Sequence, residues 1–172
     1  DSFCPDAPRI VCQTRPYPIT VTYRPVVQRH QPLPAAMASV IQEALRETTG
    51  DILVFLPGMG EIRAVERLLA PPQGVVLYRL HGSLALEQQQ MVMAPSGARK
   101  VILSSAIAES SLTIDSVRVV IDSGFARTSR LDAGTGLERL VTVRLSRASA
   151  IQRAGRAGRT APGICYRLYS EH

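Results

Sequence analysis

The stretch Ile52-Leu53-Val54-Phe55-Leu56-Pro57-Gly58 decides the fold of this chain. Five apolar residues in a row have the length of a β-strand, and Pro57-Gly58 ends the run in a turn. A strand that is apolar on both faces is typical of a parallel sheet whose two faces are both covered. We therefore expect residues 52–56 to form a central strand of an α/β domain.

Similar apolar runs recur along the chain and alternate with patterns of helical spacing. From residue 35 onward, the expected order is α-β-α-β-α-β-(short α)-β, followed by a hairpin, a helix and a last strand. The expected strands, in addition to 52–56, are a short one at 19–23, buried ones at 75–78, 101–103 and 117–121, the hairpin at 125–130 and 137–143, and 163–169. A helix that Ser83 caps is expected to run through Gln90. This order predicts a mainly parallel sheet between two layers of helices.

Four small, polar, glycine-containing loops follow the expected strands, at residues 57–60, 81–83, 104–106 and 122–124. In an open α/β sheet, ligands bind beyond the carboxyl ends of the strands. Because all four loops would lie at that edge, they favour a binding surface over ordinary turn chemistry, which remains the alternative for each loop.

The octet Gln152-Arg153-Ala154-Gly155-Arg156-Ala157-Gly158-Arg159 carries three arginines at a spacing of three, with glycines at the same spacing. On a helix, residues three apart are neighbours, so the arginines would share one face. Each glycine inside a helix costs about 1 kcal/mol relative to alanine, which indicates a close approach to the backbone. We interpret the octet as a phosphate-binding helix, with a solvated basic face as the alternative.

The 172 residues fit one domain with a net charge of +6. Residues 118–167 contain ten arginines and three acids, so the positive charge is concentrated there and indicates a polyanionic partner. No apolar run reaches membrane-spanning length, and the start lacks the features of a signal peptide. Cys4, Cys12 and Cys165 show no metal-ligand spacing, so we expect reduced thiols in the cytoplasm and no metal site. Because the chain does not begin with Met, it looks like a piece of a longer protein.

The octet fits the QRxGRxGR motif of superfamily 2 helicases, and residues 105–114, SAIAESSLTI, resemble the TNIAETSLTI motif of the DEAH-box branch. Residues 51–58, 81–84 with 88–90, and 120–124 resemble three further blocks of the same family. The versions at 57–63, 122–124 and 166–171 are most similar to the bacterial HrpB-type helicases. The resemblance covers nearly all of the chain from about residue 15 onward.

This resemblance implies a RecA-like three-layer α/β/α sandwich, with a mainly parallel sheet and a protruding β-hairpin. Residues 35–172 would be the second RecA-like domain, and residues 1–34 a linker and a strand leading in from a first RecA-like domain. That first domain carries the Walker A lysine and the acidic Mg²⁺ motif in the family, and neither motif occurs here. ATP, or another nucleoside triphosphate, and Mg²⁺ would therefore be held mainly by the first domain, and this domain alone would be inactive.

The resemblance also implies residues on the nucleotide side, where positioning and charge neutralisation drive phosphoryl transfer. Arg159 and Arg156 would reach the β- and γ-phosphates, with Arg159 as the arginine finger, and Gln152 would help place the attacking water. The further nucleotide-side residues are Arg153, whose side chain could instead face the domain, Asp115 near the ribose, and Ser111 as a sensor of nucleotide state. A turn role for Asp115 is equally compatible with its position.

On the nucleic-acid side, Ser105 would bond a phosphate, while Gly58, Gly82 and Ser83 would offer backbone contacts. Such contacts read the sugar-phosphate chain and not the bases. The expected partner is single-stranded RNA or DNA, which the hairpin would separate. Glu109 is expected to be structural. The segment Met91-Val92-Met93 lacks the aromatic residue that stacks on adenine in the family, so we expect loose base selectivity.

The resemblance thus favours the second motor domain of an ATP-dependent helicase that moves nominally 3′ to 5′. The main alternative is a stand-alone, non-catalytic RecA-like module that binds nucleic acid or regulates a partner. A basic α/β domain for a small phosphate ligand is a third, weaker alternative. The correctly spaced Gln152, Arg156 and Arg159 favour the motor, because a binding module has little need of them.

Overall fold

The structure, a computed structural model, describes residues 17–24, 32–110, 114–132, 134 and 136–171. Its centre is a six-stranded sheet in the order β1-β8-β5-β2-β4-β3, in which every neighbouring pair is parallel. The strands are β1 (Ile19–Tyr23), β2 (Asp51–Phe55), β3 (Val75–Leu80), β4 (Arg99–Ser104), β5 (Val117–Asp122) and β8 (Gly163–Arg167). The predicted parallel α/β sheet is confirmed.

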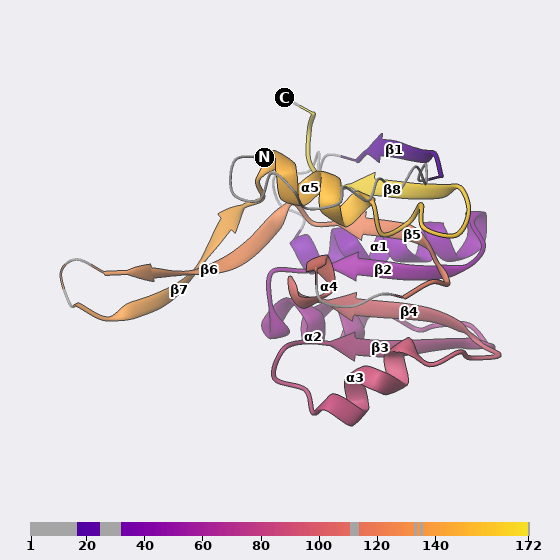
Figure 1. Ribbon diagram of the computed structural model, residues 1–172, viewed down its shortest axis with the longest axis horizontal. Coiled ribbons are helices and arrows are strands. Elements are labelled where there is room, and N and C mark those ends of the chain that lie inside the picture. The colour runs from indigo at the N-terminus through magenta and orange to yellow at the C-terminus, as the bar shows by residue number, and fades with distance from the viewer. Residues whose placement is uncertain (1–16, 25–31, 111–113, 133, 135, 172) are drawn as a thin grey trace, which may run out of the picture.

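Helices cover both faces of this sheet (Figure 1). The helices are α1 (Leu33–Glu47), α2 (Met59–Leu68), α3 (Leu86–Met93), α4 (Ile107–Ser110) and α5 (Arg147–Ala154). The first two pack on one face of the sheet and the last three on the other. This is the expected three-layer sandwich.

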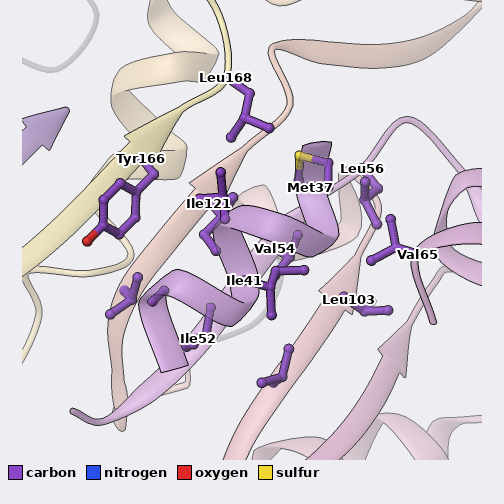
Figure 2. Packing of buried hydrophobic residues seen from close by; sticks show 14 of the residues in the cluster. Met37, Ile41, Ile52, Val54, Leu56, Val65, Leu103, Ile121, Tyr166 and Leu168 are labelled. Carbon is purple, nitrogen blue, oxygen red and sulfur yellow. The ribbon is translucent and has the colours of Figure 1, made fainter. Parts of the chain in front are cut away.

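The central strand β2 faces both cores at once. Ile52 and Val54 pack under α1 and α2, whereas Leu53 and Phe55 pack on the opposite side. Figure 2 shows the first of these cores, in which Met37 and Ile41 of α1 lie over the sheet. Full burial of such side chains contributes about 1.5–3 kcal/mol each, which is why the continuous apolar run specifies a central strand.

Strands β6 (Phe125–Leu131) and β7 (Glu138–Arg144) form a separate antiparallel hairpin. It projects beyond the edge of the main sheet (Figure 1). Its exposed side chains include Leu131, Leu137 and Leu140. The backbone N–H of Leu145 donates to Gly124 O at 2.9 Å and so joins the end of the hairpin to its beginning. The predicted hairpin is thus confirmed.

Three predicted details differ from the structure. Strand β3 is an edge strand of which Leu80 alone is buried, because it has one neighbour in the sheet and α3 covers it only in part. Helix α3 begins after Ala85, so Ser83 is not its cap. The last strand ends at Arg167, short of the predicted residue 169. The predicted entry strand β1 pairs with β8 and so forms one edge of the main sheet.

Candidate nucleotide and nucleic-acid site

The four predicted loops meet at the carboxyl edge of the sheet, because the strands before them are parallel neighbours. Hydrogen bonds between backbones join the loops to one another. Leu56 N donates to Ser104 O at 2.8 Å, Ser105 N to Leu80 O at 3.1 Å, and Ser123 N to Phe55 O at 3.2 Å. The edge is therefore a continuous, rigid surface of small residues, as a close approach by a backbone requires.

The predicted nucleic-acid residues differ in their accessibility on this surface. The backbone of Gly82 is open, since a Cβ built there would meet only Ile107 Cδ1, at 3.9 Å. Ser83 is exposed, and its Oγ lies 2.9 Å from His81 Nδ1. The backbone N–H of Ser83 also donates to Nδ1, so His81 accepts there and carries its proton on Nε2 when neutral. Ser105 is only 9% exposed, whereas Ala106 beside it is exposed.

Gly58 is covered by a residue that sequence reasoning missed. A Cβ at Gly58 would lie 3.1 Å from the guanidinium of Arg127, which reaches over from the hairpin and pairs with Glu61 at 3.3 Å. The small residue thus makes room for a cation at the carboxyl edge. Nothing in the sequence pattern connects Arg127 with Gly58, because the contact depends on how the hairpin bends back over β2.

The octet is not a continuous helix, which corrects the sequence interpretation. Helix α5 ends at Ala154, and residues 155–161 form turns and bends that lead to β8. Arg153 and Arg156 are buried, whereas Arg159 is exposed, so the three arginines do not share a face. A spacing of three is compatible with a helix and with successive turns, and here the turns are formed.

Gly158 is required to be small by its packing within the chain, so its presence does not depend on a bound phosphate. A Cβ there would lie 2.7 Å from both Tyr17 O and Ile19 Cγ1, so the close approach is made by the chain leading into β1. The N–H of Tyr17 in turn donates to Gly158 O at 3.1 Å. The glycine spacing therefore reflects, at this position, packing of the octet against the first strand.

Arg153 lies inside the domain, in agreement with the alternative that the sequence left open for its side chain. Its side chain is fully buried, with Nη1 2.9 Å from Asp122 Oδ1 and Nε 2.9 Å from Glu109 Oε2. Nη1 also donates to Phe125 O, and the guanidinium lies 4.8 Å from the centre of the Phe55 ring. Burial raises the pKa of Asp122, an effect that the charge of Arg153 opposes.

Glu109 holds two arginines of the octet at once. Its carboxylate accepts from Arg153, and its backbone carbonyl accepts from Arg156 Nη2. Burial lowers the pKa of Arg156, and the nearby positive charge of Arg159 acts in the same direction. The structural role expected of Glu109 is confirmed.

The far end of the octet meets Asp115 at the amino edge of the sheet. Thr160, the residue after Arg159, donates from Oγ1 to Asp115 O at 2.6 Å and accepts from Arg118 Nη1 at 2.9 Å. Asp115 is exposed in a turn before β5. The structure thus brings Arg159 and Asp115, two predicted nucleotide-side residues, to the same edge.

A hollow of about 280 Å³ adjoins this edge, lined by Met93, Lys100 and Asp115 among others. Lys100 is the only lysine of the chain and is buried. Its Nζ donates to Val92 O and Ala94 O at 3.0 and 2.8 Å, so it fixes the carboxyl end of α3. Met93 and Asp115 thus line the same hollow.

Two predicted nucleotide-side residues, Gln152 and Ser111, have no side-chain contact described above. Gln152 is exposed on the last turn of α5, and Ser111 lies outside the described residues.

Among the described residues, no group of three or more His, Cys, Asp or Glu could hold a metal ion. In the same part of the chain, no helix has the length and apolarity to cross a membrane. Cys165 is a buried free thiol. Burial raises the pKa of this thiol to about 12.

Comparisons with known proteins show the family of this chain. The model of the helicase conserved C-terminal domain family matches residues 35–161. The chain is 44% identical over 171 residues to ATP-dependent RNA helicase HrpB of Escherichia coli, which covers 97% of this chain and 21% of HrpB. It is 41% identical to the human protein named probable ATP-dependent RNA helicase DHX34, over 99% of this chain and 16% of that protein.

A solved structure shows the same fold. The crystal structure of the Escherichia coli DEAH/RHA helicase HrpB superposes with a TM-score of 0.87 at 44% identity, over 97% of this chain and 22% of that one. The chain therefore spans about a fifth of the length of HrpB and less of DHX34.

Proposed function

Because this chain belongs to the helicase conserved C-terminal domain family, in its DEAH-box branch, we propose that it is the second RecA-like motor domain of an ATP-dependent RNA helicase. A first RecA-like domain, N-terminal in the same protein, would hold ATP or another nucleoside triphosphate and Mg²⁺. Residues 1–34 would then serve as the linker and leading strand, and residues 35–172 as the motor domain. The present chain alone would not hydrolyse nucleotide.

One observation carries this proposal: residues from α5 to Thr160 contact both the segment that follows β4 and the segment that precedes β5, and so connect the two edges of the sheet. Residues 105–110 follow β4 at the carboxyl edge, residues 114–116 precede β5 at the amino edge, and residues 147–160 lead from the carboxyl edge to the amino end of β8. They are joined by Glu109 in the middle and by the Thr160–Asp115 hydrogen bond at the end. A displacement at the nucleotide edge would therefore be transmitted to Ser105 at the opposite edge.

At the amino edge, we propose that Arg159 is the arginine finger and that Arg156 supports it. Arg159 is exposed and precedes Thr160, which is hydrogen-bonded to Asp115 O, and this position fits a group that reaches a nucleotide held by another domain. The buried Arg156, fixed on Glu109, would contribute charge with little freedom to move. Gln152 and Ser111 keep their proposed roles in water placement and nucleotide sensing.

At the carboxyl edge, we propose that single-stranded nucleic acid crosses the loops after β3, β4 and β2. Gly82 offers an open backbone, Ser83 an exposed hydroxyl and Ser105 a hydroxyl at the rim. Arg127 over Gly58 adds a guanidinium that suits phosphate. Because these groups face a sugar-phosphate chain, binding would show little sequence preference.

The test is hydrolysis of nucleoside triphosphates by the longer polypeptide that contains both RecA-like domains, with and without single-stranded RNA. We expect RNA-stimulated turnover that falls by at least about 10²-fold in Arg159→Ala, the scale on which arginine fingers act. Arg67→Ala is the matched control, since Arg67 is exposed on α2, on the opposite face of the sheet. Turnover that is indifferent to Arg159 would instead favour a non-catalytic nucleic-acid-binding module.

A further inference from the structure

A second cationic surface lies apart from the octet, at the root of the hairpin. A hollow of about 440 Å³ opens there between the end of β7, the first turn of α5 and the end of β8. Its walls include the guanidinium-bearing side chains Arg144, Arg147 and Arg167, together with Tyr169 and Glu171. Figure 1 shows α5 beginning next to the root of the hairpin, so these elements converge in space.

The hollow carries an excess of positive charge, with three arginines and one carboxylate in its walls. Arg144 and Arg147 are exposed, and the side chain of neither forms a hydrogen bond or an ion pair within the described part of the chain. By contrast, Arg24, Arg79 and Arg127 each pair with a glutamate elsewhere on the surface. Clustered cations without acidic partners create a positive potential that attracts an anion.

The third arginine forms a rigid wall of the hollow. Arg167 donates from Nη1 to the hydroxyl of Tyr23 at 2.9 Å and from Nη2 to Ala150 O at 3.2 Å. Its guanidinium also lies 5.5 Å from the centre of the Tyr23 ring. The hydroxyl of Tyr169 is buried there and has no hydrogen-bond partner among the residues that the structure describes. A fixed cation beside two exposed ones is a suitable cradle for a tetrahedral anion.

The position of the hollow connects it with the proposed strand path. Leu168 N donates to Asp122 O, and Leu145 N donates to Gly124 O, so the walls are tied to the loop after β5. That loop shares the carboxyl edge with Gly58 and Ser105. In the sheet order, β8 lies three strands from β4, a separation of about 14 Å. A single-stranded nucleic acid that crosses the loops after β4, β2 and β5 would therefore reach the hollow next.

We propose that this hollow binds a phosphate group of the single-stranded nucleic acid, with Arg144 and Arg147 in contact with the phosphate and Arg167 as the fixed wall. The inference rests on the proposed nucleic-acid function and extends its track to the hairpin. The phosphate would hold the strand at the root of the hairpin, where the two strands of a duplex would part. Guanidinium groups match phosphate oxygens through paired N–H donors, which makes arginine the suitable residue.

The test is the affinity of the chain for a fluorescein-labelled single-stranded RNA of about 16 nucleotides, a length within the range of single-strand sites. Fluorescence anisotropy at several salt concentrations compares the double variant Arg144→Gln, Arg147→Gln with the matched control Arg63→Gln, Arg67→Gln. The control removes two exposed arginines from α2, on the other face of the sheet. Thermal unfolding by circular dichroism verifies that both variants keep the fold.

We expect the hollow variant to bind RNA about tenfold more weakly. The slope of log K against log salt should become shallower by about 0.7 for each phosphate that the variant no longer neutralises. The control should change affinity by less than about twofold, since it removes only distant charge. Equal affinities of the two double variants would overturn the proposal.

A second arm titrates inorganic phosphate and follows its ³¹P NMR signal. If phosphate binds saturably and depends on Arg144 and Arg147 while RNA affinity does not, the hollow serves a small phosphate ligand and the strand assignment is wrong. If the unsubstituted chain does not bind RNA at all, the proposed nucleic-acid function fails, and this inference fails with it. The two failures are therefore distinguishable.

Discussion

Arg153 and Asp122 form an ion pair that is wholly inside the domain, with Nη1 and Oδ1 2.9 Å apart and both side chains 0% exposed. The pair joins the helix of the octet to the end of β5, at the point where the hairpin begins. Removing one partner of a buried ion pair leaves an uncompensated charge and typically costs 3–5 kcal/mol. The relationship therefore yields a prediction about stability.

Arg153→Met should lower the free energy of unfolding by about 3–5 kcal/mol, because Asp122 would remain buried without its cation. Urea denaturation followed by circular dichroism measures this change. The matched control is Arg139→Met, which breaks an exposed pair with Asp132 on the hairpin and should cost at most about 1 kcal/mol. Similar losses in the two variants would contradict a central role for the buried pair.

Arg156→Ala and Arg159→Ala should separate stability from catalysis. Arg156 is buried and bonded to Glu109 O, so its loss should reduce both the unfolding free energy, by about 1–3 kcal/mol, and the turnover. Arg159 is exposed, so its loss should reduce turnover with a change in stability within about 0.5 kcal/mol. Denaturation curves and steady-state hydrolysis by the two-domain polypeptide measure the two effects. A large loss of stability in Arg159→Ala would argue that its role is structural.

The sequence predicted the central strands well, because a continuous apolar run such as residues 52–56 can be buried only between two layers. It could not predict the position of β1, since the pairing of Ile19 with Gly163 depends on a contact between distant segments. Ser83 has a side chain suited to capping, but its hydroxyl lies against His81 and α3 starts later. Local chemistry thus identified the elements, and tertiary packing set their ends and edges.

For the candidate site too, local sequence predicted some features, and tertiary packing set the others. The motif resemblance predicted roles for Arg159, Asp115 and the carboxyl-edge loops, and these segments lie at the two edges of the sheet. It could not show that Arg153 points inward, because the partner Asp122 lies 31 positions away and is specified by the fold. Arg127 over Gly58 and the cations of the hairpin root were missed for the same reason.

The two glycines of the octet should differ in their tolerance of alanine. Gly158→Ala should destabilise the chain by about 1–3 kcal/mol, because its methyl group would overlap Tyr17 O and Ile19 at 2.7 Å. Gly155 has φ −57° and a nearest contact of 3.3 Å, to Gln152 O, so Gly155→Ala should stay within about 1 kcal/mol of the unsubstituted chain. Thermal and urea unfolding of both variants measure these changes in stability. Equal tolerance would mean that β1 does not pack on the octet in solution.

Cys165 should resist alkylation in the folded chain. Its thiol is buried in β8, and burial raises its pKa to about 12, so the reactive thiolate fraction at pH 8 is about one in ten thousand. Iodoacetamide treatment at pH 8, followed by peptide mass spectrometry, should leave Cys165 unmodified without denaturant and modify it fully in urea. Because the thiolate becomes appreciable only as the pH approaches 12, raising the pH from 7 to 9 should leave the protection intact. Rapid labelling of the folded chain would contradict the burial of β8.

Met93→Phe should strengthen nucleotide binding if the hollow beside Asp115 takes the base. Stacking on an aromatic side chain is worth about 1–3 kcal/mol per base, and the thioether already supplies part of this, so KM for ATP should fall about three- to tenfold. The larger face of a purine should make the gain greater for ATP and GTP than for UTP and CTP, with kcat little changed. Steady-state hydrolysis by the two-domain polypeptide measures these values. The matched control is Met91→Phe, which lies two residues away, is 64% exposed and lines a different hollow, between α3 and β3. An equal effect of the two substitutions, or a change in kcat alone, would place the base elsewhere than against Met93.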